Sequence, residues 1–327
     1  MKKVVDDTQL MVKVCDLYYN KGVDQKQIAE TLGISRPTVS RLLAAARERG
    51  IVRITVMELD SIKHWDLERA LRERYGLKEV IVVDDAPTRE EREKILGAAA
   101  GQYLLDHISG DSVVGVSMGT TLLSALDYLE KQEAPGQWQG DSAVRTGSGP
   151  TFVPLIGGMG KLRMELHSNS IAEALSRKLG GEFVPIHAPA RVSDSRIRTQ
   201  MMQEESVAAA IRLEDKMDLA LSGIGYPNEG SSISATGYYR ENEVESLLQQ
   251  GAVGEICMQF YDKDGHTEPF REYNKVIGVD VSRLRKIPLS VGVAGGIEKT
   301  EAIRGAILGK YINVLITDKS CAQALAN

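Results

Sequence analysis

The spacing of apolar residues changes along the chain and divides it into two parts. Up to about residue 56 the apolar positions recur every three to four residues, as in amphipathic helices. From residue 79 onward, short apolar runs alternate with amphipathic stretches. The runs predict strands over 79–83, 112–116, 152–156, 183–186, 217–222, 275–279, 289–293 and 312–316. The stretches between them predict helices over 88–107, 120–131, 168–179, 195–211, 241–250 and 296–308.

This alternation predicts an α/β fold for the larger part. Strands that are apolar on both faces and separated by helices form mostly parallel sheets. We therefore expect one domain over 1–56, a linker helix within 57–78 that ends at Gly76, and an α/β domain over 79–327. The stretch 132–150 is rich in glycine and proline and is expected to be a surface loop.

Residues 24–47 have the pattern of a helix-turn-helix. Ile28, Ala29 and Leu32 form one apolar stripe, and Gly33 is expected to end that helix. Ser35 can cap a second helix that has a proline in its first turn. A helix over 8–20 would supply the third wall, and residues 50–56 are expected to form a wing strand.

The charge of the chain supports a nucleic-acid partner for this part alone. The net charge is −5, but residues 1–56 hold 10 basic and 6 acidic residues, a balance of +4, which leaves −9 for the remainder. We expect double-stranded DNA to contact Gln25, Ser35, Arg36, Pro37, Thr38, Ser40, Arg41, Arg49 and Arg53. The alternative is a plain three-helix packing module with a solvated basic face.

Several other classes of protein have little support. No apolar run approaches the ~18 residues that a membrane span needs, so we expect a soluble, cytoplasmic chain without a membrane partner. Cys15, Cys257 and Cys321 lie far apart and are expected to be buried thiols rather than a disulfide framework or a zinc site. We expect no metal and no cofactor.

A glycine-rich segment after the strand 112–116 has the chemistry of an anion site. It places Gly115, Ser117, Gly119, Thr120 and Thr121 where a helix begins, and that helix has no acidic residue before residue 127. The positive end of the helix dipole is then left for an external anion such as phosphate.

The same residues allow two other interpretations. They match Gly-x-Ser-x-Gly, the nucleophile elbow of serine hydrolases, in which Ser117 would need a histidine base. His167, His187 and His266 follow it in the chain, but nothing places any of them beside the serine. The segment could also be a turn that binds no ligand.

Three further glycine segments are weaker candidates. The segment around Gly157 and Gly158 resembles a P-loop but lacks its first glycine and its Ser or Thr, so it is either a tight turn or a ligand contact. Gly223 and Gly225 indicate only a close backbone approach. Lys299 lies in a first helical turn, where it opposes the dipole unless an anion or a carboxylate such as Glu298 compensates.

Taken together and in this order, these segments resemble the SorC/DeoR-type sugar-binding transcriptional regulators of bacteria, which include deoxyribonucleoside and central glycolytic gene regulators. The resemblance rests on 25–43, 114–121, 251–257, 293–299 and 311–318. It implies a winged helix-turn-helix joined to an effector domain similar to sugar-phosphate isomerases and deaminases. It also implies a homodimer or homotetramer on operator DNA. The irregular stretch 132–150 departs from the family pattern.

The resemblance also implies roles for individual residues. Phosphate would lie against Ser117, Gly119, Thr120 and Thr121, with Lys299 neutralising it, and Gly157, Gly158, Gly223 and Glu255 would line the sugar side. Our hypothesis is a DNA-binding repressor of a carbohydrate or nucleoside catabolic operon, controlled by a phosphorylated sugar and without enzymatic activity. The alternative is a sugar-phosphate isomerase, deaminase or serine hydrolase that carries a DNA-binding module, with Glu255 or His187 as its base.

Overall fold

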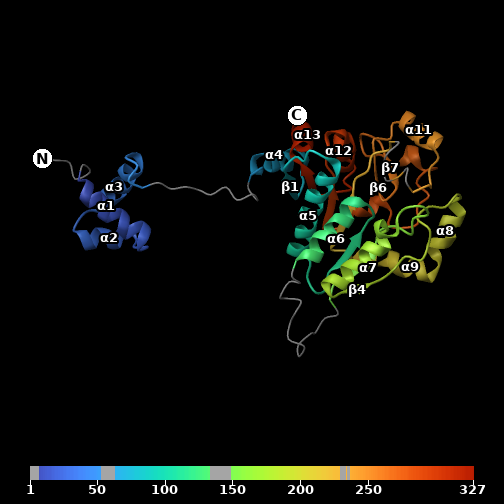
Figure 1. Ribbon diagram of the computed structural model, residues 1–327, viewed down its shortest axis with the longest axis horizontal. Helices are drawn as coiled ribbons and strands as arrows, with labels where there is room; N and C mark the ends of the chain where they lie inside the picture. The colour runs from blue at the N-terminus through green and yellow to red at the C-terminus, as the bar shows by residue number, and fades with distance from the viewer. Residues whose placement is uncertain (1–6, 53–62, 133–148, 229–232, 234–235) are drawn as a thin grey trace, which may run out of the picture. The chain divides into compact units, whose positions relative to one another are not determined.

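The computed structural model describes residues 7–52, 63–132, 149–228, 233 and 236–327 (Figure 1). The chain forms two compact units, Met1–Lys63 and His64–Asn327, and each is described by itself. Among the described helices, none is long and apolar enough to cross a membrane. Cys15, Cys257 and Cys321 are buried free thiols, as the sequence predicted.

The small unit is a bundle of three helices. They are α1 (Thr8–Cys15), which continues into the π-helical turn η2 (Asp16–Asn20), α2 (Gln25–Leu32) and α3 (Arg36–Glu48). Their apolar faces meet in one core that includes Met11, Val14, Ile28, Val39, Leu42 and Leu43. The periodic apolar residues therefore face inward, which confirms the predicted helix-turn-helix.

Local sequence signals set the ends of α2 and α3. The Asp24 carboxylate accepts hydrogen bonds from the Lys26 and Gln27 backbone N–H groups in the first turn of α2, and Gly33 ends that helix in the left-handed conformation at φ 64°. The Ser35 side chain caps α3 by accepting from the Thr38 N–H at 3.3 Å. Of the predicted wing strand, residues 53–56 lie outside the described residues, and Ile51 and Val52 form a bend.

The large unit is built on a seven-stranded sheet in the order β1-β9-β8-β5-β2-β3-β4, and every pairing in it is parallel. The strands are β1 (Glu79–Val83), β2 (Val113–Val116), β3 (Thr151–Pro154), β4 (Glu182–Phe183), β5 (Leu219–Gly223), β8 (Leu289–Val293) and β9 (Val314–Asp318). A separate antiparallel hairpin joins β6 (Gly254–Ile256) to β7 (Gln259–Tyr261).

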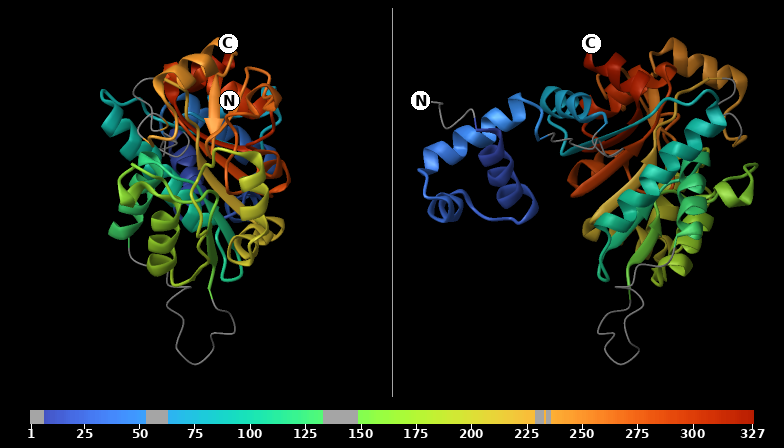
Figure 2. Two further views of the ribbon diagram at one scale, coloured as in Figure 1. Left: turned by 90° about the vertical axis from the view of Figure 1, so that its right-hand side faces the viewer. Right: turned by 60° about the vertical axis from the view of Figure 1, so that its left-hand side comes forward.

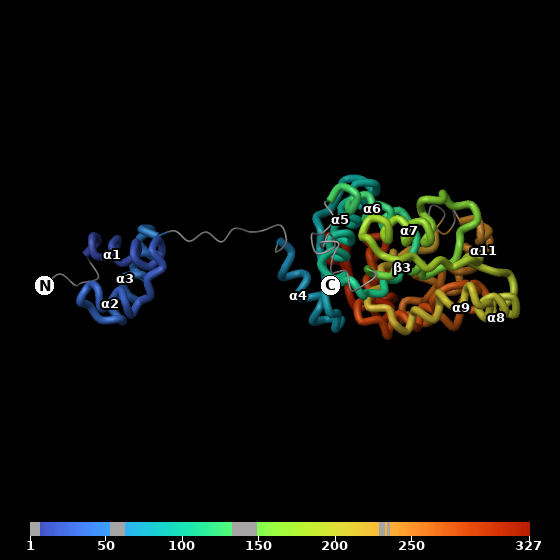
Figure 3. The backbone as a smooth tube through the Cα atoms, turned by 90° about the horizontal axis from the view of Figure 1, so that it is seen from below, coloured from blue at the N-terminus to red at the C-terminus, as the bar shows by residue number. Residues whose placement is uncertain are grey.

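Helices cover both faces of this sheet. The helices are α4 (Trp65–Tyr75), α5 (Arg89–His107), α6 (Thr120–Lys131), α7 (Ser168–Leu179), α8 (Ser195–Gln203), α9 (Glu205–Ile211), α11 (Glu241–Gln249), α12 (Thr300–Leu308) and α13 (Lys319–Ala326). Short 3-10 turns are η4 (Met164–Leu166), η5 (Arg212–Lys216), η6 (Glu268–Phe270), η7 (Val281–Lys286) and η8 (Ile297–Lys299). The core on one face joins α5, α6 and α7, and the core on the other joins α4, α9, α12 and α13 (Figures 2 and 3).

The structure corrects several expected elements. The segment 275–279 is not a strand of the sheet; it makes only isolated bridges from Val276 to Arg191 and from Gly278 to Ile156. The helix expected over 195–211 breaks at Glu204 into α8 and α9. The hairpin β6–β7 and the helix α13 were not predicted. Short apolar runs alone do not distinguish a sheet strand from a buried connection, which explains the first error.

The helix expected to link the two parts packs within the large unit. Leu71 of α4 is fully buried in the core beneath the sheet, and the Tyr75 hydroxyl donates to the Leu325 carbonyl of α13 at 2.9 Å. The helix ends at Gly76, as its sequence predicted, with φ 67°.

Between the neighbouring strands β5 and β2, the chain connections that follow the two strands run toward opposite edges of the sheet. From β2 the chain proceeds outward through β3 to β4, whereas from β5 it proceeds the other way through β8 to β9. The segments that follow β2 and β5 therefore diverge to opposite faces of the sheet. In open α/β sheets, ligands bind at such a switch point, beyond the carboxyl ends of the strands.

Candidate effector pocket and nucleic-acid interface

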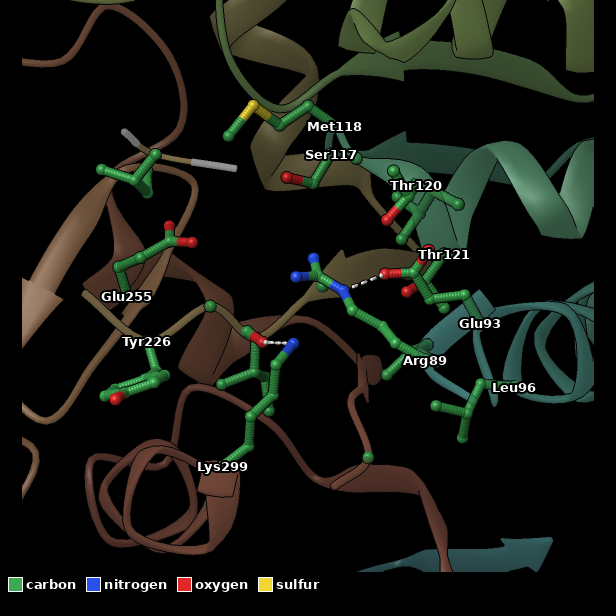
Figure 4. Close-up of a pocket in the computed structure, with 18 of the residues that line it drawn as sticks. Arg89, Glu93, Leu96, Ser117, Met118, Thr120, Thr121, Tyr226, Glu255 and Lys299 are labelled. Atoms are coloured by element: carbon green, nitrogen blue, oxygen red, sulfur yellow. Dashed lines mark hydrogen bonds and ion pairs between the residues drawn. The ribbon is translucent and has the colours of Figure 1, made fainter. Parts of the chain in front are cut away.

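A pocket lies at this switch point, beyond the carboxyl ends of β2, β5 and β8 (Figure 4). Segments that are far apart in the sequence meet there. The residues that line it are Arg89, Arg92, Glu93, Leu96, Ser117, Met118, Gly119, Thr120, Thr121, Leu122, Gly223, Ile224, Gly225, Tyr226, Asn228, Ile233, Glu255, Cys257, Val293, Gly295, Glu298 and Lys299.

One wall of the pocket is the start of α6. Gly119 precedes the helix with φ 118° and ψ 172°, a conformation that only glycine adopts readily, and this turn directs the chain from β2 into the helix. Within α6, all of which the structure describes, the first turn carries no acidic side chain, and Gly119 offers no side chain to cap it. The positive end of the α6 dipole therefore faces the cavity beside Thr120 and Thr121.

Ser117 lies at the base of this wall. Its side chain is 2% exposed, and its Oγ accepts a hydrogen bond from the Cys257 Sγ at 3.4 Å. The serine hydroxyl hydrogen is therefore left to donate toward the cavity. Burial raises the pKa of the Cys257 thiol to about 12, so this thiol stays protonated at neutral pH.

The hydrolase interpretation of Ser117 lacks a histidine base among the described residues that line the pocket. The described residues that line the pocket include no histidine. Both ring nitrogens of His167, the next histidine in the chain, face backbone groups, the Met159 N–H at 3.5 Å and the Leu162 carbonyl at 3.1 Å. Among the described lining residues, Ser117 therefore lacks the histidine base that a serine hydrolase of this kind uses.

Glu255 forms the opposite wall on the hairpin strand β6. Its Oε2 accepts a hydrogen bond from the Met258 N–H at 2.8 Å, and its backbone exchanges two 3.0 Å hydrogen bonds with Gly225. A Cβ at position 225 would overlap the Glu255 carboxylate, so a larger residue there would displace this side chain from its present position. Burial raises the pKa of Glu255 to about 7 and outweighs the Met258 hydrogen bond and the charge of Lys299, which lower it.

Lys299 enters the pocket from η8. Its Nζ donates to the Ile224 carbonyl at 2.9 Å, which satisfies one of its three donors (Figure 4). Burial lowers the pKa of Lys299, and the charge of Glu255 is the largest effect that opposes this. The lysine is thus held between β5 and the hairpin by tertiary contacts.

Helix α5 contributes two arginines that sequence reasoning missed. The Arg89 Nε lies 2.9 Å from the Glu93 Oε1, and the Arg92 Nη2 lies 2.9 Å from the Glu298 Oε1. Positions 89, 92 and 93 share one face of a helix, so the sequence alone already shows that this face is charged. Nothing local in the sequence shows that this face borders the ends of β2 and β8.

Three of the expected effector residues do not line the pocket. Gly115 lies inside β2, where an added Cβ would be 2.5 Å from Leu155 Cδ2 and 2.8 Å from Met217 Sδ, so this glycine allows close packing. Gly157 and Gly158 lie against the backbone at 188–189, and the Gly158 N–H donates to the Ala188 carbonyl at 2.8 Å. The other expected positions, Ser117, Gly119, Thr120, Thr121, Gly223, Gly225, Glu255 and Lys299, meet in one cavity.

The candidate nucleic-acid interface is the outer face of α3. Arg36, Pro37, Ser40, Arg41 and Arg49 are exposed, whereas Thr38 and Gln25 are half-buried. The Arg41 Nε donates to the Pro37 carbonyl at 3.2 Å, which keeps the arginine along its own helix. The Thr38 hydroxyl lies 2.8 Å from the capping Ser35 hydroxyl, so these two side chains also shape the start of α3. Arg53 lies outside the described residues.

The small unit is a helix-turn-helix, and the large unit is an α/β domain with a polar pocket at its switch point. This combination is typical of one class of protein, the transcriptional regulators that respond to a ligand. Comparison with known proteins supports this class for both units. Residues 60–327 match the family described as "Putative sugar-binding domain", and residues 17–60 match the MarR family.

Relatives cover almost the whole chain. It is 32% identical over 323 residues to the sorbitol operon regulator of Klebsiella pneumoniae, with 98% of each chain covered. It is also 32% identical to the deoxyribonucleoside regulator of Bacillus subtilis, with 98% of this chain and 97% of that protein covered. The crystal structure of the full-length sorbitol operon regulator SorC from Klebsiella pneumoniae matches with a TM-score of 0.71 over 98% of this chain and 100% of that chain. The chain belongs to this family of SorC-type sugar-binding transcriptional regulators, which confirms the resemblance and the fold class predicted from its sequence.

Proposed function

We propose that the protein is a cytoplasmic repressor of a carbohydrate or nucleoside catabolic operon, and that a phosphorylated sugar bound in the switch-point pocket sets its affinity for operator DNA. The observation that carries this proposal is the start of α6, which lines the pocket without an acidic residue in its first turn or a side-chain cap within the described α6. A helix start of this kind favours an anionic group, and phosphate oxygens accept from several N–H and hydroxyl groups at once.

The phosphoryl group would bind at this wall. The hydroxyls of Ser117, Thr120 and Thr121 and the backbone N–H groups at the start of α6 would donate to its oxygens. The Arg89 guanidinium is directed into the cavity toward the same wall and would add positive charge (Figure 4). Lys299 would contribute from the other side of the pocket.

The sugar would lie between this wall and the hairpin. Gly223 and Gly225 leave room beside the end of β5, and the Glu255 carboxylate accepts hydrogen bonds from hydroxyl groups. Gly115, Gly157 and Gly158 are outside this proposal, because they pack against neighbouring segments.

Helix α3 would read the operator. Arg36 and Arg41 are exposed and carry guanidinium groups that match guanine edges and phosphates, and Ser40 offers a hydroxyl. A homodimer or homotetramer would present paired α3 helices to half-sites about 10–10.5 bp apart or a multiple of this spacing. The sugar phosphate would bind one arrangement of the assembly more tightly and shift its population toward that arrangement.

The two halves of the proposal are tested on the full-length chain. Arg41→Ala should abolish operator binding in a fluorescence-anisotropy titration and leave the melting-temperature rise with sugar phosphates unchanged. Arg196→Ala is the matched control, because Arg196 is 90% exposed on α8 and pairs only locally with Asp194. Operator binding that survives in Arg41→Ala would show that α3 is not the recognition helix.

The effector is tested by thermal unfolding with free and phosphorylated sugars. A ligand that binds only the native state raises the melting temperature in proportion to its occupancy. We expect a rise with a phosphorylated sugar and none with its free sugar. A rise with free sugars alone would contradict the phosphate site at α6.

A further inference from the structure

The charged side chains that line the pocket balance one another. Among the described residues the lining holds three basic side chains, Arg89, Arg92 and Lys299, and three acidic ones, Glu93, Glu255 and Glu298. Asp318, at the end of β9, lies 3.9 Å from Arg92 and is buried. The side chains therefore give the cavity no excess of positive charge.

Both arginines already face carboxylates. Arg89 pairs with Glu93 at 2.9 Å, and Arg92 pairs with Glu298 at 2.9 Å. The Asp318 Oδ2 also accepts from the Gly296 N–H at 2.6 Å, so this carboxylate is fixed beside Arg92. An anion that approached Arg92 would meet Glu298 and Asp318 at the same place.

The start of α6 differs from the rest of the pocket. Its positive potential comes from backbone dipoles, and no acidic side chain of the described first turn neutralises it. Since the side-chain charges cancel, this wall is where an added negative charge is favoured. The pocket can therefore neutralise one phosphoryl group far better than two.

The opposite wall has the chemistry of a hydroxyl acceptor. Glu255 is 5% exposed, and its Oε2 is held by the Met258 N–H. Among the described residues, none donates a hydrogen bond to its Oε1, and the carboxylate is directed toward the cavity (Figure 4). A neutral polyol satisfies such an oxygen, whereas a second phosphoryl group would be repelled by Glu255 when it is ionised.

We propose that the effector of this protein carries a single phosphoryl group at one end and uncharged hydroxyl groups at the other, and that sugar bisphosphates are excluded. The proposal rests on the proposed function, since it assumes that the phosphoryl group binds at the start of α6. Its new element is that the ion pairs between α5 and η8 select sugar monophosphates over sugar bisphosphates. These pairs act as built-in counter-charges against a second phosphate.

The test compares matched pairs of compounds on the full-length protein. The pairs are fructose 6-phosphate with fructose 1,6-bisphosphate, glucose 6-phosphate with glucose 1,6-bisphosphate, and ribose 5-phosphate with ribose 1,5-bisphosphate. Dissociation constants are measured by titration calorimetry. In the pair that contains the tightest ligand, we expect the bisphosphate to bind about tenfold more weakly or worse, since it brings two more charges near fixed carboxylates.

Two glutamate variants distinguish electrostatic repulsion by the pocket carboxylates from simple steric exclusion of the bisphosphate. Glu298→Gln removes the partner of Arg92 and should reduce the discrimination against the bisphosphate several-fold. Glu90→Gln is the matched control, because Glu90 lies on α5, the helix that carries Arg92, pairs with Lys94 at 2.6 Å and does not line the pocket. It should leave the discrimination unchanged.

Each result has a distinct meaning. A bisphosphate that binds as tightly as its monophosphate partner would overturn this inference and leave the proposed function standing. A discrimination that Glu298→Gln does not reduce would overturn the counter-charge explanation. If neither the sugar phosphates nor inorganic phosphate bind, the anion site itself is absent and the proposed function fails.

Discussion

Two glycine-rich segments follow neighbouring parallel strands, and the structure uses them in different ways. After β2, Gly119 turns the chain at φ 118° into α6 and leaves the start of that helix facing the pocket. After β3, Gly157 and Gly158 let the chain approach the backbone at 188–189 and take no part in the pocket.

The difference shows that a glycine-rich turn has no function of its own. At Gly119 an added Cβ would meet nothing within 4 Å, so the glycine serves the backbone conformation and the open space beside it. At Gly157 it would meet the Ala188 carbonyl oxygen at 2.5 Å, so the glycine serves close packing. A segment binds a ligand only where the fold keeps the adjacent space empty.

The largest expected effect comes from placing a negative charge at the first of these segments. Thr120→Asp should weaken the binding of sugar phosphates by about a hundredfold or more, because the carboxylate would occupy the start of α6 and repel phosphate. The same change should stabilise the chain by about 0.5 kcal/mol, because an acidic side chain favours a helix start. Calorimetric titration and chemical unfolding measure the two effects.

The opposite signs make this variant informative. A chain that loses both stability and binding would indicate a disturbed loop rather than a filled anion site. Unchanged phosphate binding would contradict our assignment of the α6 start.

Glu255, which faces the first segment across the pocket, should give the protein a pH dependence. Folding raises its pKa from 4.5 to about 7, so the folded state holds more protons between these values. The free energy of unfolding therefore falls as pH rises through this range, by about 3 kcal/mol from this group, and the effect is constant above it. Glu255→Gln should remove that part of the slope.

The measurement is urea unfolding of the parent chain and of Glu255→Gln at several pH values from 4.5 to 8. As pH rises, the free energy of unfolding of the parent chain should fall relative to that of the glutamine variant. A constant difference would show that Glu255 titrates in the folded chain as it does in an open one.

A matched pair of glycine variants tests the comparison directly. Gly157→Ala and Gly119→Ala should each lower the free energy of unfolding by about 1–3 kcal/mol, the first through a backbone clash and the second through strain at positive φ. Only Gly119→Ala should also weaken sugar-phosphate binding. Chemical unfolding and calorimetric titration of both variants check this, and a larger binding loss in Gly157→Ala would reverse the two assignments.

The smallest effect concerns the start of α5, which also borders the pocket but carries acidic residues in its first turn. The Glu91 N–H donates to the capping Thr88 hydroxyl at 3.2 Å, and the Glu91 side chain accepts from that hydroxyl at 3.0 Å. Glu91→Gln should lower the free energy of unfolding by about 0.5 kcal/mol and leave phosphate binding unchanged. A gain in phosphate binding would show that α5 also offers an anion site.

Much of the local structure could be predicted from the sequence. The caps of α2 and α3, the end of α4 at Gly76 and the strands β1, β2 and β8 follow signals carried by a few consecutive residues. The failures have a common cause. The segment 275–279 is apolar because it is buried between other segments, and its sequence cannot say which partner it meets.

The candidate site divides in the same way. The sequence by itself determined the helix-turn-helix, the alternation that makes an α/β sheet, and the lack of acidic residues at the start of α6, because neighbouring residues create each of these features. The family resemblance implied that Glu255 and Lys299 belong to the site, but only the tertiary structure decided that the α5 arginines line the same pocket and that Gly157 and Gly158 do not. The order of strands in the sheet determines which of these residues lie close together, and that order arises from packing between segments far apart in the chain.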